Sequence, residues 1–481
     1  MSTAPCTATS VGRSYRARDQ RSEVGGQTTV DRSSENQKIR RLEGLKNTNL
    51  LISGRLRRRR RRSINNHTST IQVAEFTIEH QCPQCGAPAL LRETDRFFSC
   101  EFCRVNSFLV QDDFSQYMLP NTAPKGKNLV YYPYWRFKGM LFSCLESGIR
   151  HRFIDVSYQA VESRLFPITL GLRSQALKLS FATPEKSGYF LKPTFSFNKA
   201  MNIFKLRFST SLPGPVFYQS HIGDSISLIY SPFYEEDKIY DAVLNKPLTS
   251  IPPDDFNASS FPGGRPNSHI QFLPTLCPAC GWDLEGQRDT LILSCRNCST
   301  AWRPTKDGLN PVEFATMPTN DNNIIYFPFW RIKAEISGIQ LDSYADLIRI
   351  ANLPKAIQKD WKGRGFHFWS PAFKVRPKVF MQLGRNITLS QPEKIMAAEL
   401  PEDRIHPVTL STEDAAEGLI MNMAGFMKPA KDMFPILKDI TIKPKRYLLV
   451  YMPFVEQYHD YVQPELYLAI NKNQLSLASN L

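Results

Sequence analysis

Aromatic and aliphatic residues dominate two short segments of the chain, residues 128–138 and 323–333. Both begin with Asn, continue through a Tyr-aromatic-Pro-aromatic-Trp run and end in Arg-x-Lys, and matched positions are 195 residues apart. This composition predicts β-strands, in which successive side chains point to opposite sides. Alternation then divides the first segment into two faces, one with Tyr132, Tyr134, Arg136 and Lys138, the other with Tyr131, Pro133, Trp135 and Phe137.

These aromatic strands allow two interpretations. Exposed rings would form a platform on which bases or another ligand stack, whereas buried rings would form the core of a sheet. Large aromatic side chains at strand spacing are mostly buried, so the sequence favours a core. Proline inside each strand, at Pro133 and Pro328, predicts an edge strand or a β-bulge, because proline cannot donate a hydrogen bond to a neighbouring strand.

The Tyr-x-Pro-aromatic motif occurs four times, around Pro133, Pro232, Pro328 and Pro453. The early copy in each half of the chain carries Arg-x-Lys, and the late copy carries a Glu. We expect the two copies in each half to lie near each other and to form two ion pairs, Arg136 with Glu235 and Arg331 with Glu456. A further similarity relates residues 190–195 to residues 368–373, at an offset of 178 residues.

Each aromatic strand is preceded by four cysteines with C-x2-C-x14-C-x2-C spacing: Cys82, Cys85, Cys100 and Cys103, then Cys277, Cys280, Cys295 and Cys298. Two C-x2-C knuckles joined by a short hairpin complete a tetrahedron of thiolates, which is a closed zinc environment. Redox dithiols are the alternative, but a redox C-x-x-C usually occurs singly in a βαβ context. We therefore predict two Zn²⁺ ions, one per four-cysteine site, with iron in a rubredoxin-like geometry as the competing assignment.

The predicted metal sites are structural rather than catalytic. Four protein thiolates leave no coordination position for water or substrate. In the first knuckle of each set, Gly86 and Gly281 supply the positive φ that brings backbone N–H groups towards sulfur. The second knuckles end at Arg104 and Ser299 and lack this glycine, so we expect them to be less regular.

The order of these segments predicts an α+β, β-dominated fold with an internal duplication, in which each half is headed by a rubredoxin-like zinc ribbon. The expected boundaries are a disordered Arg-rich tail (1–75), zinc ribbon 1 (76–120), β-rich domain 1 (121–248), a linker (249–275), zinc ribbon 2 (276–312) and β-rich domain 2 with a helical insertion (313–481). We expect the two halves to pack with approximate two-fold pseudo-symmetry. The insertion opens on a capped helix start at 411–417, and four methionines after it are interpreted as core filling rather than as an adaptable binding surface: Met421, Met423, Met427 and Met433.

Positive charge is concentrated in the tail. The chain carries a formal charge of +15, of which residues 1–70 account for +11, with sixteen Lys and Arg against five acids. The unbroken run Arg57–Arg62 is either a phosphate-binding or targeting element or a solvated, self-repelling segment. Each ribbon is instead anionic, with a net side-chain charge of −1 before the thiolates and metal add about −2. Phosphate binding needs the opposite sign, so the ribbons are not predicted to contact nucleic acid.

The sequence contains no P-loop, no dinucleotide-binding glycine fingerprint, no H-E-x-x-H and no nucleophile elbow, which favours a non-enzymatic role. The polar group His151, Arg152 and Asp155 falls on a predicted strand and is interpreted as an exposed face. No apolar run approaches the roughly 18 residues that cross a bilayer, and no secretory signal is recognisable. Eight of the ten cysteines lie in C-x2-C pairs, leaving Cys6 and Cys144, which favours metal sites in a reducing, cytoplasmic location.

A Cys-Pro-x-Cys-Gly ribbon followed by a Tyr-x-Pro-Phe-Trp-type strand resembles a group of bacterial tandem zinc-ribbon proteins of largely undefined function. The resemblance covers Cys82 to Lys138 and Cys277 to Lys333, under a quarter of the chain. Some members carry labels borrowed from the zinc ribbons of transcription factors or replication-restart helicases, but this chain has no helicase ATP-binding motif. Its Arg-rich tail also departs from the group. The resemblance implies zinc binding without an established substrate.

The sequence thus predicts a zinc-binding, non-enzymatic scaffold or adaptor that contacts a protein partner. The alternative is a nucleic-acid-associated factor, in transcription or replication, that uses the Arg run at 57–62. A third hypothesis is an iron electron-transfer protein. The partner, the biological process and the oligomeric state are not predicted by the sequence.

Overall fold

The computed structural model describes residues 77–110, 114–173, 177–248, 261–266, 270–393 and 397–476. The predicted Arg-rich tail (1–75), with the Arg57–Arg62 run and Cys6, lies outside the described residues. Strands predominate over helices in the part of the chain that is described, so the prediction of a β-dominated fold is confirmed.

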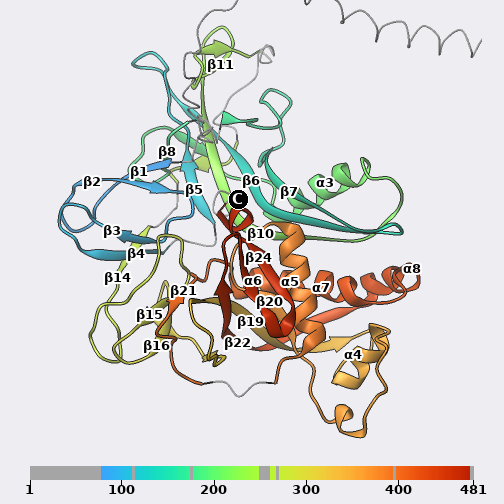
Figure 1. The fold of residues 1–481 in the computed structure, drawn as a ribbon. Helices are drawn as coiled ribbons and strands as arrows, with labels where there is room; N and C mark the ends of the chain where they lie inside the picture. Colours follow the sequence, from blue (N-terminus) through green and yellow to red (C-terminus); the bar gives the residue numbers. More distant parts are fainter. Residues whose placement is uncertain are drawn as a thin grey trace, which may run out of the picture. The chain divides into compact units, whose positions relative to one another are not determined.

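The first half of the chain builds a large mixed sheet around two long strands (Figure 1). Its main path has the order β13-β9-β6-β10-β5-β8-β1-β2, with β7 paired to β6 and β11 to β10. The elements are β1 (Thr77–Gln81), β2 (Pro88–Arg92), β3 (Phe97–Ser99), β4 (Asn106–Val110), β5 (Ser115–Met118), β6 (Val130–Leu145), β7 (Gly148–Gln159), β8 (Leu179–Phe181), β9 (Tyr189–Leu191), α3 (Phe197–Ser209), β10 (Val216–Glu235), β11 (Ile239–Asp241), β12 (Lys246–Pro247) and β13 (Gly263–Gly264).

The second half repeats the arrangement around β19 and β22, with the sheet path β20-β19-β22-β23-β24 and with β18 and β21 at its sides. Its strands are β14 (Gln271–Pro274), β15 (Leu293–Cys295), β16 (Thr300–Thr305), β17 (Gly308–Pro311), β18 (Phe314–Thr316), β19 (Ile324–Ser337), β20 (Phe368–Pro371), β21 (Arg404–Ile405), β22 (Thr441–Glu456), β23 (Asp460–Gln463) and β24 (Leu468–Asn471). Its helices are α4 (Tyr344–Ile350), η2 (Lys359–Lys362), α5 (Pro377–Ser390), α6 (Thr412–Glu417), α7 (Leu419–Phe426), α8 (Ala430–Met433), η3 (Phe434–Asp439), η4 (Pro464–Leu466) and α9 (Lys472–Ser476).

The two Tyr-x-Pro-aromatic motifs of each half lie directly opposite each other on antiparallel strands. In β6 and β10, Pro133 faces Tyr230 and Tyr131 faces Pro232. The same reciprocal pairing recurs in β19 and β22, where Pro328 faces Tyr451. The prediction that the two copies of each half are neighbours is therefore confirmed.

The ion pairs predicted from these motifs are wrong. Arg136 is bonded to Glu93 and Asp155, whereas Glu235 pairs in register with Ile239 of β11. In the second half, Glu456 is bonded to Arg404 and Lys472, and Arg331 contacts His367. The antiparallel register explains the difference, because it places each Arg near the middle of the strand pair and each Glu at its end.

Proline in the aromatic strands does not mark an edge strand, contrary to the sequence expectation. Pro133 lies where the neighbour of β6 changes from the parallel strand β9 to the antiparallel strand β7. Pro328 lies at the same kind of change, between β21 and β20 beside β19. A position between two neighbours tolerates a residue without an N–H group. The register shifts that do interrupt these strand pairs lie elsewhere, at Val216–Tyr218, Gly223–Ser225 and Lys333–Ala334.

Residues 404–410, rather than 368–373, are the structural counterpart of residues 189–195. The indole N–H of Trp135 donates to the carbonyl oxygen of Phe195 at 2.9 Å, and that of Trp330 donates to Leu410 at 3.0 Å. Strand β20, which contains 368–371, instead takes the place of β7. The predicted match of residues 190–195 with residues 368–373 is therefore wrong. The two segments share a Phe-x-x-Pro pattern, but they occupy different places in their sheets.

Helices α3 and α6 begin at equivalent points, two residues after these carbonyl groups, and the residue between is the N-cap. The side chain of Ser196 accepts a hydrogen bond from the N–H of Lys199, and that of Ser411 accepts from Asp414. Ser411 and Asp414 form a complete capping box, as the sequence predicts. The repeat therefore extends from strand to cap, well beyond the motifs that are visible in the sequence.

Removing either indole hydrogen bond is expected to have the same effect in both halves. Trp135→Phe and Trp330→Phe each leave a buried carbonyl group without its donor, which costs about 1–3 kcal/mol of folding free energy. Urea unfolding of the two variants beside the wild type measures this. A large loss for one variant and none for the other would show that the two tryptophans are not equivalent.

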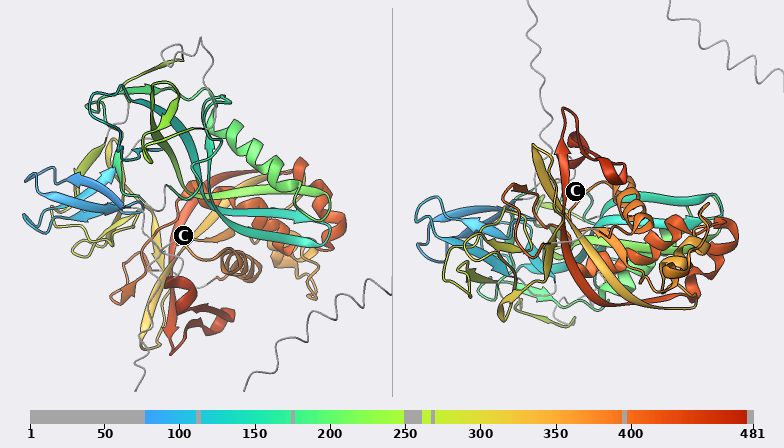
Figure 2. Two further views of the ribbon diagram at one scale, coloured as in Figure 1. Left: turned by 90° about the horizontal axis from the view of Figure 1, so that it is seen from above. Right: turned by 60° about the horizontal axis from the view of Figure 1, so that its bottom comes forward.

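The aromatic strand of the first half is buried on both faces, and the two faces pack into different clusters. Tyr132 and Tyr134 belong to one cluster, whereas Trp135 and Phe137 belong to another that α3 covers with Phe204. Figure 2 shows α3 lying along the long strands. The predicted alternation and the core interpretation are both confirmed, so these rings are not a stacking platform.

The far ends of β6 and β10 are buried against the second half. Phe142 and Cys144 of β6 and Ile222 of β10 belong to the same cluster as the core of the second half. The Sγ atom of Cys144 lies 3.9 Å from the Sδ atom of Met421. Core filling is confirmed for Met421, Met423 and Met427, which are all buried, and Met433 packs at the margin of the same cluster.

Candidate metal centres

Both predicted cysteine sets converge in the structure. All four Sγ atoms of each set lie within 4.8 Å of one another. In the first set, Cys82 and Cys103 are 3.8 Å apart and Cys85 and Cys100 are 3.7 Å apart. In the second, the matching Sγ distances are 3.6 Å for Cys277–Cys298 and 3.5 Å for Cys280–Cys295.

These distances fit a metal ion bound by four thiolates. A tetrahedral ion with metal–sulfur bonds of about 2.3 Å separates its sulfur atoms by about 3.8 Å. A disulfide needs about 2.05 Å, and every cysteine in the described part of the chain is free. Zinc and iron both suit such a site, so the sulfur geometry fits a four-thiolate metal ion without selecting the metal.

The four knuckles share one backbone conformation. The N–H of Gly86 donates to the carbonyl oxygen of Cys82, and the N–H of Gly281 donates to that of Cys277. Both glycines have a φ near +74°. Arg104 and Ser299 adopt the same left-handed region, with φ of 58° and 52°, so the second knuckles are as regular as the first. The expectation of irregularity was wrong because a metal site can hold a residue other than glycine in this conformation.

Backbone N–H groups favour the thiolate form in each set. The N–H groups of Cys103 and Phe102 lower the pKa of Cys100 to about 6. Burial opposes ionisation of Cys277, but the N–H groups of Ala279 and Cys280 outweigh it and lower the pKa of this thiol to about 6. Other thiols of the same sets have raised pKa values: Cys85, to about 11, and Cys103, Cys295 and Cys298. Only part of each set is therefore ionised at neutral pH without metal, and the thiolate is the form that binds metal.

The two ribbons pack against each other and share a strand pairing. Strand β14, immediately before the second ribbon, pairs antiparallel with β4 of the first. It lies within residues 249–275, for which the sequence predicts a linker, as does β13, which pairs with β9. Phe108 and Val110 of the first ribbon and Leu284 and Leu293 of the second form a common cluster that also includes Cys277 and Cys295. Figure 2 shows the two ribbons side by side in both views.

Polar contacts reinforce this contact between the ribbons. The carbonyl oxygen of Arg288 accepts hydrogen bonds from the N–H groups of Arg96 and Phe97, at 2.6 and 2.9 Å. The guanidinium group of Arg288 donates to the buried carboxylate of Asp95 at 2.6 Å. The hairpin of one ribbon therefore holds the hairpin of the other, and the two metal centres belong to one folded module.

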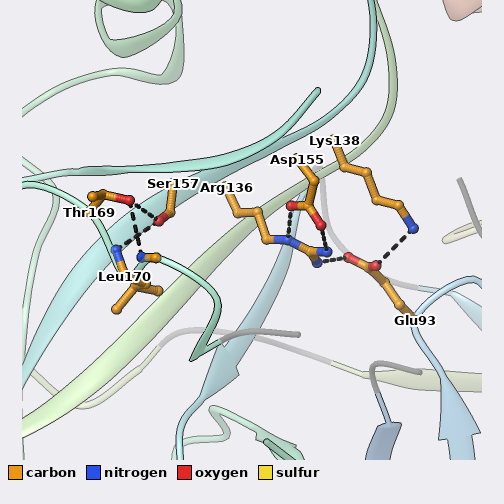
Figure 3. A network of polar contacts seen from close by, with 8 residues as sticks. Glu93, Arg136, Lys138, Asp155, Ser157, Thr169 and Leu170 are labelled. Carbon is orange, nitrogen blue, oxygen red and sulfur yellow. Dashed lines mark hydrogen bonds and ion pairs between the residues drawn. The ribbon is translucent and has the colours of Figure 1, made fainter. Parts of the chain in front are cut away.

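A buried charge network joins the first ribbon to the aromatic strand (Figure 3). Glu93, on the hairpin between the knuckles, bonds to Arg136 and lies 3.4 Å from the Nζ atom of Lys138. Asp155 of β7 accepts two further hydrogen bonds from Arg136, at 2.7 and 2.8 Å. Although burial opposes its ionisation, the cations Arg136 and Lys138 hold the pKa of Glu93 below its ordinary value.

The sequence did not single out Glu93. It is one of several acidic residues on the hairpin, and the sequence does not show which of them contacts Arg136. It placed Asp155 in a polar group with His151 and Arg152 and assigned the group to an exposed strand face. That interpretation holds for His151 and Arg152, which are exposed, but is wrong for Asp155, which lies in the buried network.

The second ribbon is joined to the second half by different contacts. The backbone N–H of Leu291 donates to the carbonyl oxygen of Val408 at 2.7 Å. Arg303 bonds to Glu413 of α6, and the N–H of Leu400 donates to the hydroxyl of Ser299 at 2.7 Å. Each metal centre is therefore held against its own half of the body.

A cavity of about 760 Å³ lies where the ribbon module meets the body. Residues of both ribbons line it, including Leu109 and Ile292, together with Trp330 and Tyr447 of the body. Three of the cations that line it, Arg303, Lys445 and Arg446, are each engaged by a carboxylate. The fourth, Arg96, donates to the backbone carbonyl oxygens of Glu93 and Asp95. Within the described residues, the two cysteine sets are the groups of metal-ligating side chains that converge.

Searches of protein-family models, curated proteins and solved structures find no match to this chain. None of the helices within the described ranges has the length and apolar character needed to span a bilayer. The fold and the cysteine geometry define a β-rich chain with two four-cysteine clusters that are positioned to hold metal ions.

Proposed function

We propose that this chain is a zinc-binding scaffold or adaptor protein with two structural zinc ribbons that mediate contacts with a protein partner. The observation that carries the zinc assignment is the convergence of two complete four-cysteine sets on knuckles of one geometry. Four thiolates close the coordination shell, which is typical of structural rather than catalytic zinc.

The packing of the ribbons supports a structural role for the metal. Cys277 and Cys295 belong to the apolar cluster that both ribbons share, so each zinc ion organises side chains of the module around it. The hairpins are short, and zinc binding supplies folding free energy that their small cores do not. The free cysteines fit a reducing compartment, and we propose a cytoplasmic location.

Two exposed aromatic side chains on the knuckles support a role in protein contacts. Phe102 is 68% exposed and Trp282 is 62% exposed. Exposed aromatic residues are enriched at protein interfaces, and the ribbons' negative charge favours a protein with a basic surface over a nucleic acid. The proposal also agrees with the resemblance to tandem zinc-ribbon proteins, which rests on sequence motifs.

Metal analysis of the chain purified without added metal tests the zinc assignment. We expect two zinc ions per chain, one for each cysteine set. Substitution with Co²⁺ is expected to give the intense visible spectrum of tetrahedral thiolate coordination, unchanged by small anionic ligands because the coordination shell is closed. Cys144→Ser is the matched control and should keep both ions, because Cys144 lies outside the two sets. Iron in place of zinc would support the electron-transfer hypothesis instead.

The scaffold role is tested by comparing partners of the wild-type chain with those of a Phe102→Ala, Trp282→Ala variant, using quantitative mass spectrometry of cross-linked complexes. Leu206→Ala is the control, because Leu206 is also exposed but lies on α3. A protein lost with the first variant and retained with the control would support the proposal. A different outcome is that the wild-type chain recovers DNA or RNA and no protein. If a chain that begins at residue 71 then fails to recover that nucleic acid, the contact is the Arg run at 57–62, and the nucleic-acid hypothesis is favoured.

A further inference from the structure

The Arg-x-Lys pair of the aromatic strand occurs in both halves of the chain. In the described residues, carboxylates balance its positive charge in the first half but not in the second. In the first half, the pair is Arg136 and Lys138, both buried. Glu93 and Asp155 surround it, so two cations meet two carboxylates (Figure 3). A buried cation needs such a partner, because leaving water costs several kcal/mol.

The equivalent pair in the second half, Arg331 and Lys333, contacts no carboxylate in the part of the chain that the structure describes. The guanidinium group of Arg331 lies 3.3 Å from the Nδ1 atom of His367. The Nζ atom of Lys333 donates to the carbonyl oxygen of Phe366, also at 3.3 Å. Both cations are half-buried.

Neither carboxylate of the first half has a negatively charged counterpart at the matching position of the second half. Asp155 lies two residues before Ser157, which faces Arg136. His367 likewise lies two residues before Trp369, which faces Arg331. His367 therefore occupies the position of Asp155. The residue 195 positions after Glu93 is Arg288, which bonds to Asp95 of the first ribbon. The second half therefore has the two cations without the two negative charges at the matching positions.

The imidazole of His367 accepts the hydrogen bond from Arg331 through its Nδ1 atom, because a guanidinium group can only donate. The ring of Trp369 lies 6.0 Å from the guanidinium carbon of Arg331, and its buried indole N–H has no partner among the described residues. Burial, together with the charges of Arg331 and Lys333, lowers the pKa of His367 to about 4, so this imidazole is neutral at pH 7. The nearby Arg364 is already engaged by Glu393.

The loop that precedes β20 passes beside the ammonium group of Lys333. Gly365 is exposed, and a Cβ atom placed on it would lie 3.7 Å from the Nζ atom of Lys333. A glycine at this point leaves the ammonium group uncovered. Lys333 and Arg331 are both half-buried, so each keeps part of its side chain exposed to solvent.

We infer that Arg331, Lys333 and His367 form a binding site for a phosphate group, as inorganic phosphate or as part of a phosphorylated small molecule. A phosphate dianion supplies the charge of −2 that Glu93 and Asp155 supply in the first half. Its oxygens accept hydrogen bonds from the guanidinium and ammonium groups together, which is the geometry in which arginine binds phosphate. The site is independent of the metal centres, and so this inference goes beyond the proposed zinc-scaffold function.

Titration calorimetry of the zinc-loaded full chain with inorganic phosphate, at constant ionic strength set with chloride, tests the site. We expect saturable binding of one phosphate with a dissociation constant below about 1 mM. His367→Asp is the decisive variant, because it restores the carboxylate that Asp155 supplies in the first half. It should weaken phosphate binding at least tenfold while raising the melting temperature of the phosphate-free protein. Arg331→Gln should weaken binding as strongly.

Arg385→Gln is the matched control, because Arg385 is an exposed cation on α5 and should leave binding unchanged. A parallel titration with glycerol phosphate distinguishes a monoester from free phosphate as the preferred source. Binding that is not saturable, or that is equal in the wild type, His367→Asp and Arg331→Gln, would overturn the inference. Such a result would mean that water solvates the charges of Arg331 and Lys333 and that no phosphate group is needed.

Discussion

Replacing Cys277 with serine is expected to remove one metal ion from the chain and to unfold the second ribbon. Structural zinc sites contribute about 10–16 kcal/mol of apparent binding free energy, and loss of one thiolate removes most of it. Cys277 is also 3% exposed and lies in the shared apolar cluster, so its loss disrupts packing as well as coordination. Metal analysis and near-ultraviolet circular dichroism of the variant measure the two effects.

The shared core makes this prediction more specific. Because β14 pairs with β4 and Arg288 holds the hairpin of the first ribbon, loss of the second site should also weaken metal binding at Cys82, Cys85, Cys100 and Cys103. The chelator concentration that removes the remaining ion is the measurement. Cys85→Ser is the reciprocal variant. If each variant leaves the affinity of the other site unchanged, the ribbons are energetically independent despite their contact.

Glu93→Gln is expected to destabilise the chain by about 3–5 kcal/mol, because it leaves Arg136 and Lys138 buried with one carboxylate between them. The substitution preserves the shape of the side chain and removes its charge. Chemical unfolding of the zinc-loaded protein measures the loss. Glu313→Gln is the control: its ion pair with Arg446 is exposed, at 62% and 73%, so its loss should cost less than about 1 kcal/mol.

The effect of Glu93→Gln should depend on pH in a defined direction. The cations Arg136 and Lys138 hold the pKa of Glu93 below its ordinary value of 4.5 in the folded chain. When the pKa of a carboxyl group is lower in the folded than in the unfolded chain, its ionised form stabilises the fold at any pH above the unfolded-state pKa. This stabilisation is lost as the pH falls through the folded-state pKa. The stability difference between wild type and variant should therefore be largest near neutral pH and shrink below about pH 4.5. A difference that stays constant with pH would indicate a packing effect rather than a charge effect.

Much of this architecture was predictable from local patterns. The cysteine spacing predicted both sulfur clusters, because C-x2-C knuckles determine their own geometry. The alternation of Tyr132 and Tyr134 with Trp135 predicted the two buried faces of β6. The recurring Tyr-x-Pro motifs predicted which strands are neighbours. These features depend on residues close together in the chain, or on a repeat that the sequence displays directly.

Contacts between distant segments were not predictable in the same way. The Arg136–Glu235 pair was a reasonable match of opposite charges, but the antiparallel register separates the two residues. Proline suggested an edge strand, because the sequence does not show that two different neighbours meet at Pro133. The false match of 190–195 with 368–373 arose because short similar patterns recur by composition, whereas equivalence depends on hydrogen bonds such as that of Trp330 with Leu410.

The sequence by itself determined the two metal-ligand sets, the duplication and the strands that follow each set. The tertiary structure alone decided that the ribbons share a core and that Glu93 and Asp155 neutralise Arg136. It also decided that His367 occupies the place of Asp155 and that Arg331 contacts no carboxylate among the residues that the structure describes. The physical reason is that coordination and alternation are set by neighbours along the chain. The balance of buried charge is set by which distant side chains the fold brings within a few ångströms.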